Sequence, residues 1–499
     1  MPKKLSPQYL EMQQRIEATA KGMGLDMFDT FYEMLDYDEI NMVASYMGFP
    51  VRYPHWKWGM EYERMSKSYE YGLHKIYEMV INNDPCYAYL LESNAPVDQK
   101  LVMCHVCGHN DFFKNNFTFQ HTNRKMIDEM ANHATRIRRY IDWFGVDVVE
   151  AFVDRCLSID NLIDVDSPYI TRKRKVVESG ETSEPLDRKR ELGLLPNTKE
   201  YMERYINPDS FVASQKKKLE DEANRQKKFP GEPERDVMRF LMEHAPLERW
   251  QVDVMDMMRE EAYYFAPQGM TKIMNEGWAS YWHCKLMTEK VMDSSEVIDF
   301  ADKNAGVMST SRQQLNPYAL GLALYRDIED RWNRGRYGKE WSECDDMAER
   351  RLWDKQSGLG REKIFQVRQI YSDVTFLDEF FTVDFCREQG FFAYEYDRKK
   401  RSFLIDTREF EAVKKKLLQQ LTNFGQPLIA VLDANFENRA ELLLEHTHEG
   451  VDLDAQYMHE TLRNVQAIWS RPVHLMTKVD DRKVLYSCDA SGLTEKTIS

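Results

Sequence analysis

The residues best suited to chemistry in this sequence are two histidines, His105 and His109, in the segment 103–113. Their spacing of four places both imidazoles on one face of a helix, an arrangement in which two histidines bind one metal ion. Gly108 removes the side chain beside the second histidine, so another helix or a substrate can approach closely. Because the same spacing also occurs in ordinary helix contacts, the pair alone leaves both interpretations open.

A second segment, residues 273–283, supplies a third ligand. Its apolar and aromatic helical pattern contains one carboxylate, Glu276, and a buried glutamate is normally paired or metal-bound. We therefore predict that His105, His109 and Glu276 bind zinc, because two histidines and one glutamate with an open fourth position form a catalytic zinc site. Tyr281 and His283 follow on this helix, and either is a candidate hydrogen-bond donor to a developing oxyanion.

The predicted ligand set is similar to that of the gluzincin metallopeptidases, in which H-E-x-x-H supplies two histidines and a later helix supplies the glutamate. E-G-W-A-x-Y, present here from Glu276 to Tyr281, is a ligand helix in one such group. The sequence departs from this pattern at Val106, which occupies the position of the general base and cannot transfer a proton.

A replacement base is predicted upstream of Glu276, where Asp253, Asp256 and Glu260 share one helical face. Glu260 or Glu261 is the candidate, and the polar side of an amphipathic helix is the alternative explanation of this face. Asp111 is the next choice, as a base or as a carboxylate partner of a ligand histidine.

The same residues are compatible with a different metal. Carboxylates at 253–260 that joined the histidines would form a non-haem iron centre, which makes a helical oxidoreductase the alternative to a zinc hydrolase. Cys104 and Cys107 form the chain's C-x-x-C pair, but no second pair exists to complete a structural zinc site. We interpret them as small side chains that face the core.

Composition limits the class of protein. The chain has 499 residues, of which 42% are hydrophobic, 30% charged and 12% aromatic, values typical of a globular protein. Its net charge of −15 argues against nucleic acid or an anionic membrane as the main partner. The basic start of the chain lacks a following apolar stretch, no window is long enough for a membrane span, and eight cysteines are too sparse for a disulfide framework. We expect a cytoplasmic protein.

The pattern of apolar residues predicts an α+β protein with a large, mainly helical, zincin-like N-terminal domain and a smaller α/β C-terminal domain. Residues 1–165 and 236–360 are expected to form the helical parts around the metal, 166–235 a charged insertion or linker, and 365–499 the small α/β domain. Helices are predicted at 8–21, 65–82, 123–144, 236–266, 271–292, 318–335, 345–355, 409–421 and 455–469, and strands at 391–396, 402–405, 427–432, 473–478 and 483–486.

Long sequence words distributed over nearly the whole chain resemble the SpoVR family, the stage V sporulation protein R and its relatives in non-sporulating bacteria. They are GFPVRYPHW at 48–56, GMEYER at 59–64, YEMVINNDP at 77–85, HV, GH and DFFKNN between 105 and 116, NEGWASYWH at 275–283, NPYALG at 316–321 and RDIEDRW at 326–332.

The resemblance implies a link to spore cortex formation, and hence to peptidoglycan, or to stress response in other bacteria. It also implies a PrkA-type serine kinase and a YhbH-like protein as partners. It assigns no catalytic residue. Three hypotheses follow: a zinc-dependent amide hydrolase acting on a peptidoglycan-related substrate, a non-haem iron oxidoreductase, and a non-catalytic scaffold for the kinase system.

Overall fold

The computed structural model describes residues 3–70, 78–170, 228–309, 315–391, 393–397, 402–407, 409–480 and 482–498, together with residues 211, 213, 214 and 217. The chain divides into two compact units. Unit 1 comprises Met1–Glu150 and Glu260–Gln426, and unit 2 comprises Ala151–Arg259 and Pro427–Ser499. The helices α6 (Val146–Leu157) and α11 (Arg249–Met270) cross the boundaries between them.

Unit 1 contains a small mixed sheet in the order β1-β2-β4-β3. Strand β2 (Thr30–Leu35) runs parallel to β4 (Cys86–Leu91), whereas β1 (Lys3–Lys4) and β3 (Glu78–Ile81) pair antiparallel with β2 and β4. The sequence did not reveal this sheet, because a short continuous apolar run such as β4 has no periodicity that separates a buried strand from a buried helix.

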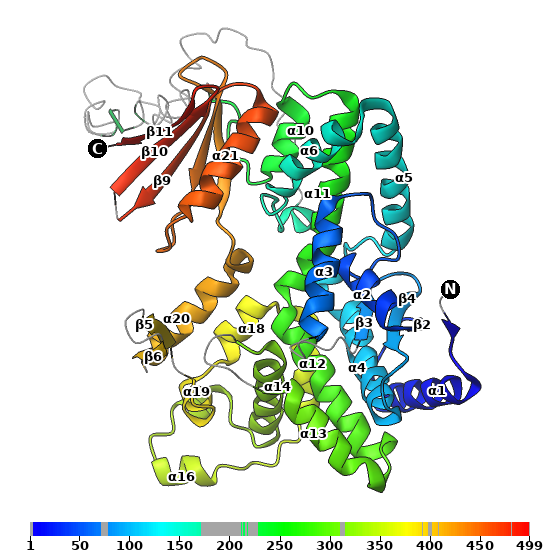
Figure 1. The fold of residues 1–499 in the computed structure, drawn as a ribbon. Coiled ribbons are helices and arrows are strands. Elements are labelled where there is room, and N and C mark those ends of the chain that lie inside the picture. Colours follow the sequence, from blue (N-terminus) through cyan, green and yellow to red (C-terminus); the bar gives the residue numbers. More distant parts are fainter. Residues whose placement is uncertain are drawn as a thin grey trace, which may run out of the picture. The chain divides into compact units, whose positions relative to one another are not determined.

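Three helices pack together in the centre of unit 1: α4 (Pro96–Asn115), α12 (Lys272–Leu286) and α14 (Pro317–Asn333). Figure 1 shows α12 and α14 in green and α4 in light blue. Proline opens both α4 and α14, where a missing N–H costs nothing. Nearly every side chain of α12 is buried, so the helix is enclosed on all sides and its sequence carries no clear amphipathic signal.

Unit 1 contains further α-helices outside this centre. They are α1 (Pro7–Gly22), α2 (Tyr37–Ser45), α3 (Trp56–Glu70), α5 (Met126–Phe144), α13 (Val297–Val307), α15 (Gly338–Ser342), α16 (Met347–Leu352), α17 (Gly360–Ile370), α18 (Asp373–Phe380), α19 (Val383–Glu388) and α20 (Phe410–Leu421). A hairpin of β5 (Ala393–Asp397) and β6 (Ser402–Thr407) also belongs to this unit. Its strands lie where the sequence predicted them.

Unit 2 is built on a five-stranded sheet in the order β11-β10-β9-β8-β7. The strands are β7 (Ile429–Phe436), β8 (Glu441–His446), β9 (Val473–Val479), β10 (Arg482–Asp489) and β11 (Gly492–Thr497). All neighbours are antiparallel except β8 and β9, which α21 (Ala455–Trp469) connects. In Figure 1 α21 lies along this sheet, and α10 (Val237–His244) contacts β7.

The predicted α+β class with a mostly helical large part is confirmed, and most predicted helices are present within a few residues of their expected ends. The helix predicted over 65–82 is wrong at its end, because Glu78–Ile81 form β3, where Val80 and Ile81 pair with Ala88 and Tyr87. The single helix predicted over 236–266 is also wrong, because α10 ends at His244, where Ala245 is extended, and α11 begins at Arg249. The insertion predicted at 166–235 lies mostly outside the described residues.

The contact units divide the chain at other positions than the domains predicted from sequence, since unit 2 joins 151–259 to 427–499. Whether residues 365–499 fold alone stays a prediction. Among the residues that the structure describes, no helix has both the length and the apolar character that a membrane span requires.

Candidate metal centre

The site is built where α4 and α12 touch. A Cβ atom at Gly108 would lie 2.6 Å from Ala279 Cα, closer than real side chains allow, so glycine permits the two helix backbones to meet. Gly277 and Gly321 give α12 and α14 the same close approach, because a Cβ at Gly277 would lie 2.4 Å from Gly321 Cα. The prediction that Gly108 admits another helix is therefore confirmed.

His105, His109 and Glu276 converge at this contact, with one potential ligand atom of each within 4.8 Å of the others. Glu276 Oε2 lies 3.6 Å from His105 Nε2 and 3.4 Å from His109 Nε2. These separations exceed the usual length of a hydrogen bond between charged groups, about 2.7–2.9 Å. Two donor atoms that are each about 2.1 Å from a tetrahedral ion lie about 3.4 Å apart, so Glu276 Oε2 lies from each histidine nitrogen at the separation expected of two ligands of one zinc-sized ion.

Hydrogen bonds behind the histidines fix which nitrogen faces the cluster. His109 Nδ1 lies 2.9 Å from Asn275 Oδ1, an acceptor, so Nδ1 carries the proton and Nε2 keeps its lone pair. His283 Nε2 lies 3.0 Å from Asn304 Oδ1 and Nδ1 lies 2.8 Å from His105 Nδ1. If Nε2–H of His283 donates to Asn304, the neutral ring accepts from His105, and Nε2 of His105 also keeps its lone pair toward Glu276.

Charge states agree with this arrangement. Burial lowers the pKa of His283 to about 3, aided by the nearby charge of His105, so His283 is a neutral acceptor at pH 7. Burial alone would raise the pKa of Glu276, but the electrostatic attraction of His109 and His105 outweighs it and holds the pKa well below its ordinary value. Glu276 is therefore a carboxylate, the state in which it binds a metal, whereas a histidine binds a metal only through a neutral imidazole.

Two aromatic rings restrict the ligand histidines further. The Tyr318 ring stacks on His105 with a centroid distance of 6.0 Å, and the Phe113 ring stacks on His109 at 6.1 Å. His105 and His109 side chains are buried, while Glu276 retains 18% exposure. The face on the side of Glu276 is therefore the part of the cluster nearest to solvent.

A buried network orients α12. Asp373 accepts hydrogen bonds from the backbone N–H groups of Ile273 and Met274, each at 2.8 Å, and so caps the first turn of the helix. Burial raises the pKa of Asp373 to about 7, against these two hydrogen bonds.

The contacts of Asp111 are those of a residue that holds helices together. It is fully buried and accepts from the Trp278 indole and the Asp26 backbone N–H, each at 2.8 Å, and pairs with Arg368 at 3.1 Å. Burial raises the pKa of Asp111 to about 6 although Arg368 opposes the shift. No histidine occurs among its hydrogen-bond partners in the described residues, so the geometry favours a role in fixing α4 against α12 over the predicted roles as base or histidine partner.

The two predicted bases belong to another cluster. Glu260 Oε2 lies 3.3 Å from His133 Nε2, and its other oxygen accepts from Asn123 at 3.0 Å. Glu261 pairs with Arg52 at 2.7 Å and with His133 Nδ1 at 3.2 Å. The structure thus groups both acids with His133 on α5, which is 127 or more residues away in sequence and could not be associated with them from local spacing.

The two predicted oxyanion donors are also engaged elsewhere. The Tyr281 hydroxyl donates to Glu329 at 2.7 Å and accepts from Lys285 at 2.6 Å. Both nitrogens of His283 are used by His105 and Asn304, which makes it a support of a ligand histidine. Cys104 and Cys107 are buried thiols in the core, as expected, and burial raises the pKa of each well above its ordinary value.

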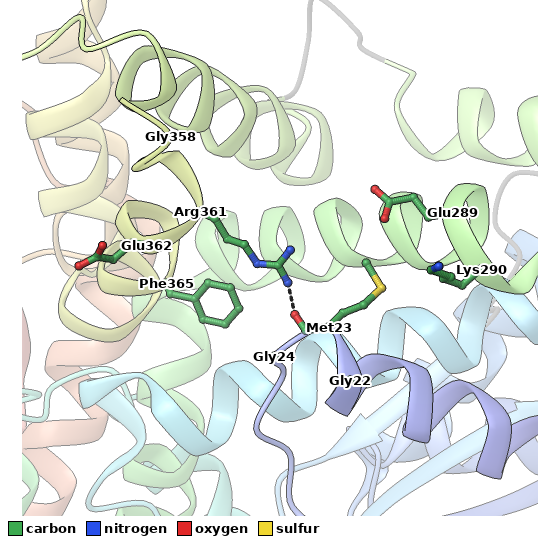
Figure 2. Close-up of a pocket in the computed structure, with 9 residues that line it drawn as sticks. All are labelled: Gly22, Met23, Gly24, Glu289, Lys290, Gly358, Arg361, Glu362 and Phe365. Carbon is green, nitrogen blue, oxygen red and sulfur yellow. Dashed lines mark hydrogen bonds between the residues drawn. The ribbon is translucent and has the colours of Figure 1, made fainter. Parts of the chain in front are cut away.

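A cavity of about 780 Å³ opens elsewhere in unit 1. Figure 2 shows it between the end of α1, with Met23, and α17, from which Arg361 donates to the Met23 carbonyl. Its charged lining residues are two acids, Glu289 and Glu362, and two bases, Lys290 and Arg361. None of the three metal-ligand candidates lines it, and its balanced charge indicates no class of ligand.

Sequence reasoning missed Asn275, Asn304 and Tyr318. Asn275 adjoins Glu276 in a buried helix, and a buried amide without a local partner was a usable signal. Asn304 and Tyr318 gave no such signal, because only tertiary packing brings α13 and α14 to the histidines.

Known protein families match nearly the whole length of the chain. The family described as "SpoVR like protein" matches residues 5–426, and "SpoVR-like C-terminal domain" matches residues 427–480. The "Uncharacterized protein YcgB" of Escherichia coli (strain K12) is 28% identical over 506 residues, which cover 94% of this chain and 91% of that protein. No solved structure matches the chain.

Proposed function

This chain belongs to the SpoVR family, and we propose that it is a zinc-dependent amide hydrolase whose metal is held by His105, His109 and Glu276. The observation that carries the proposal is the 3.4–3.6 Å separation of Glu276 Oε2 from two imidazole Nε2 atoms. Two histidines and one glutamate are a ligand set of catalytic zinc. A bound zinc ion supplies Lewis-acid chemistry, which lowers the pKa of a water molecule and polarises a carbonyl group.

The chain's own residues position this ligand set. Asn275 holds His109, and the His283–Asn304 pair holds His105, so both imidazoles face Glu276 with their lone pairs. We further propose that α4 and α12 correspond to the two ligand helices of a zincin-like fold, because they are adjacent, buried and in backbone contact at Gly108.

The peptidoglycan-related substrate, the link to cortex formation or stress response, and the cytoplasmic location are part of this proposal through the family resemblance. So are the two proposed partners, the PrkA-type serine kinase and the YhbH-like protein. Co-purification of each partner with the tagged chain, compared with the same preparation lacking the chain, tests the partners separately from the chemistry.

A non-haem iron oxidoreductase is the second candidate. Its carboxylates are not those expected at 253–260, because Glu260 is grouped with His133 and not with His105 and His109, so this candidate has the same three ligands as the zinc site. Val106 is fully buried at the position of the usual base, and Glu260 and Glu261 lie 3.3 and 3.2 Å from the nitrogens of His133. Two histidines and one carboxylate are also the ligands of non-haem iron oxygenases, which do not need a protein base to activate water.

Metal analysis of the untagged protein, followed by an amine-release assay on peptidoglycan fragments, tests the proposal. We expect zinc bound at His105, His109 and Glu276 and release of amino groups that stops in His105→Ala. The matched control is His459→Ala on α21 in unit 2, which should retain activity. Bound iron with a visible absorption band supports the second candidate. A chain that binds neither metal and retains its cellular function supports the scaffold hypothesis and contradicts both.

A further inference from the structure

A second group of metal-binding side chains lies apart from the first. Glu129, His133 and Glu260 each place one potential ligand atom within 4.8 Å of the others. Glu129 and His133 are four residues apart on α5, so they project from one face of that helix, and Glu260 comes from α11. None of the three belongs to the cluster around Glu276.

The histidine of this group is held like a metal ligand. His133 is fully buried, and its Nδ1 lies 3.2 Å from Glu261 Oε1. Glu261 is itself fixed by a buried ion pair with Arg52 at 2.7 Å. A carboxylate that accepts from one imidazole nitrogen orients the ring and increases the basicity of the other, the arrangement common behind metal-bound histidines.

The second nitrogen of His133, Nε2, faces the carboxylates but forms no hydrogen bond with them. Its Nε2 is buried and has no hydrogen-bond partner among the described residues, although Glu260 Oε2 lies 3.3 Å away. A hydrogen bond between an imidazolium and a carboxylate is normally about 2.7–2.9 Å long. The contact at 3.3 Å is longer than this, and about 3.3 Å is also the separation of two ligand atoms around one ion, so an ion can bind between the two groups without displacing either.

The carboxylates of Glu260 and Glu129 also accept hydrogen bonds from neighbouring asparagines. Asn123 donates to Glu260 Oε1 at 3.0 Å, and Asn132 donates to Glu129 Oε2 at 3.5 Å. Glu260 keeps 41% exposure, so an ion can reach the group from solvent and keep water as its remaining ligands.

We propose that Glu129, His133 and Glu260 form a second metal site, which takes a divalent first-row ion such as zinc or manganese and fastens α5 to α11. One imidazole nitrogen and two carboxylates are a ligand set for these ions. The site is independent of the proposed zinc centre, since it shares no residue with it.

Zinc titration of the chelator-treated full chain, against a chromophoric competitor, tests the proposal. We expect two ions per chain in the wild type and one in Glu260→Gln, with the lost site weakened at least 10-fold. Glu129→Gln should behave likewise. The matched control is Asp256→Asn, an exposed carboxylate one turn earlier on α11, which should bind as the wild type does.

A His105→Ala chain separates this site from the first, because it should lose the first ion and keep the second. The midpoint of thermal unfolding provides an independent readout: added zinc or manganese should raise it in His105→Ala but not in the His105→Ala, Glu260→Gln double variant. Two results overturn the proposal. One is unchanged affinity in Glu260→Gln, and the other is no ion bound by His105→Ala at millimolar zinc, which would make His133 a charged imidazolium between two carboxylates.

Discussion

The close contact of α4 and α12 at Gly108 makes a quantitative prediction for Gly108→Ala. The added methyl group would lie 2.6 Å from Ala279 Cα and 3.2 Å from Ala279 Cβ. Ordinary contacts between carbon atoms are about 3.5–4.0 Å long, so the two backbones must separate by about 1 Å. Both neighbouring atoms belong to rigid parts of α12, which cannot rotate away.

This separation affects stability and metal binding differently. Overpacking costs about 1–3 kcal/mol, and the better helix propensity of alanine offsets about 1 kcal/mol of this cost. We therefore expect the free energy of unfolding to fall by up to about 2 kcal/mol. The ligands of a metal site must be held within about 0.5 Å of their binding positions. A shift of about 1 Å between the histidines and Glu276 should therefore weaken metal binding at least 10-fold.

The assay compares Gly108→Ala with Gly59→Ala, a control on α3 where an added Cβ meets nothing within 4 Å. Urea unfolding of the metal-free proteins gives the stability change, and competition with a chelator gives the affinity. The control should be neutral or slightly stabilised and should bind metal normally. Wild-type metal affinity and stability in Gly108→Ala would refute the reasoning that the helix contact sets the site.

Three further predictions follow from the same geometry. His105→Ala and His109→Ala should each remove the metal of the first site, measured by elemental analysis, and full retention in both would refute the ligand assignment. His283→Leu should weaken metal binding about 10- to 100-fold, because His105 loses its acceptor, while His283→Gln can still accept and should bind more tightly than His283→Leu; equal affinities would contradict the tautomer argument. Burial raises the pKa of Asp373 from 3.8 to about 7, so the folded state binds this proton more tightly than the unfolded state, and the stability that Asp373 contributes is fully present below pH 3.8 and lost as the pH rises through 7. The difference in stability between wild type and Asp373→Asn should therefore change across pH 4–7, and a constant difference would be inconsistent with this shift.

The sequence alone was sufficient to predict that the three ligand candidates lie together. His105 and His109 follow helical spacing, and Glu276 is a carboxylate in an apolar helix, so both signals are local. The roles of the residues around them depend on tertiary contacts. The sequence could not show that Glu260 is a partner of His133 and not a catalytic base, because the two residues are far apart in the chain. The support that His283 gives His105 likewise depends on the contact between α4 and α12.

The difference between local and tertiary signals also explains which elements of the fold could be predicted. Alternating or amphipathic segments such as α21, predicted at 455–469, were recognised because their pattern repeats. Strand β4 was missed because its run of buried residues is short and continuous.

The most direct test of the central claim is to locate the metal by anomalous diffraction from crystals of the zinc-loaded chain. The account predicts an anomalous peak at the meeting point of α4 and α12, about 2.0–2.2 Å from His105 Nε2, His109 Nε2 and a Glu276 carboxylate oxygen. A fully loaded crystal with no peak at these three atoms would contradict it.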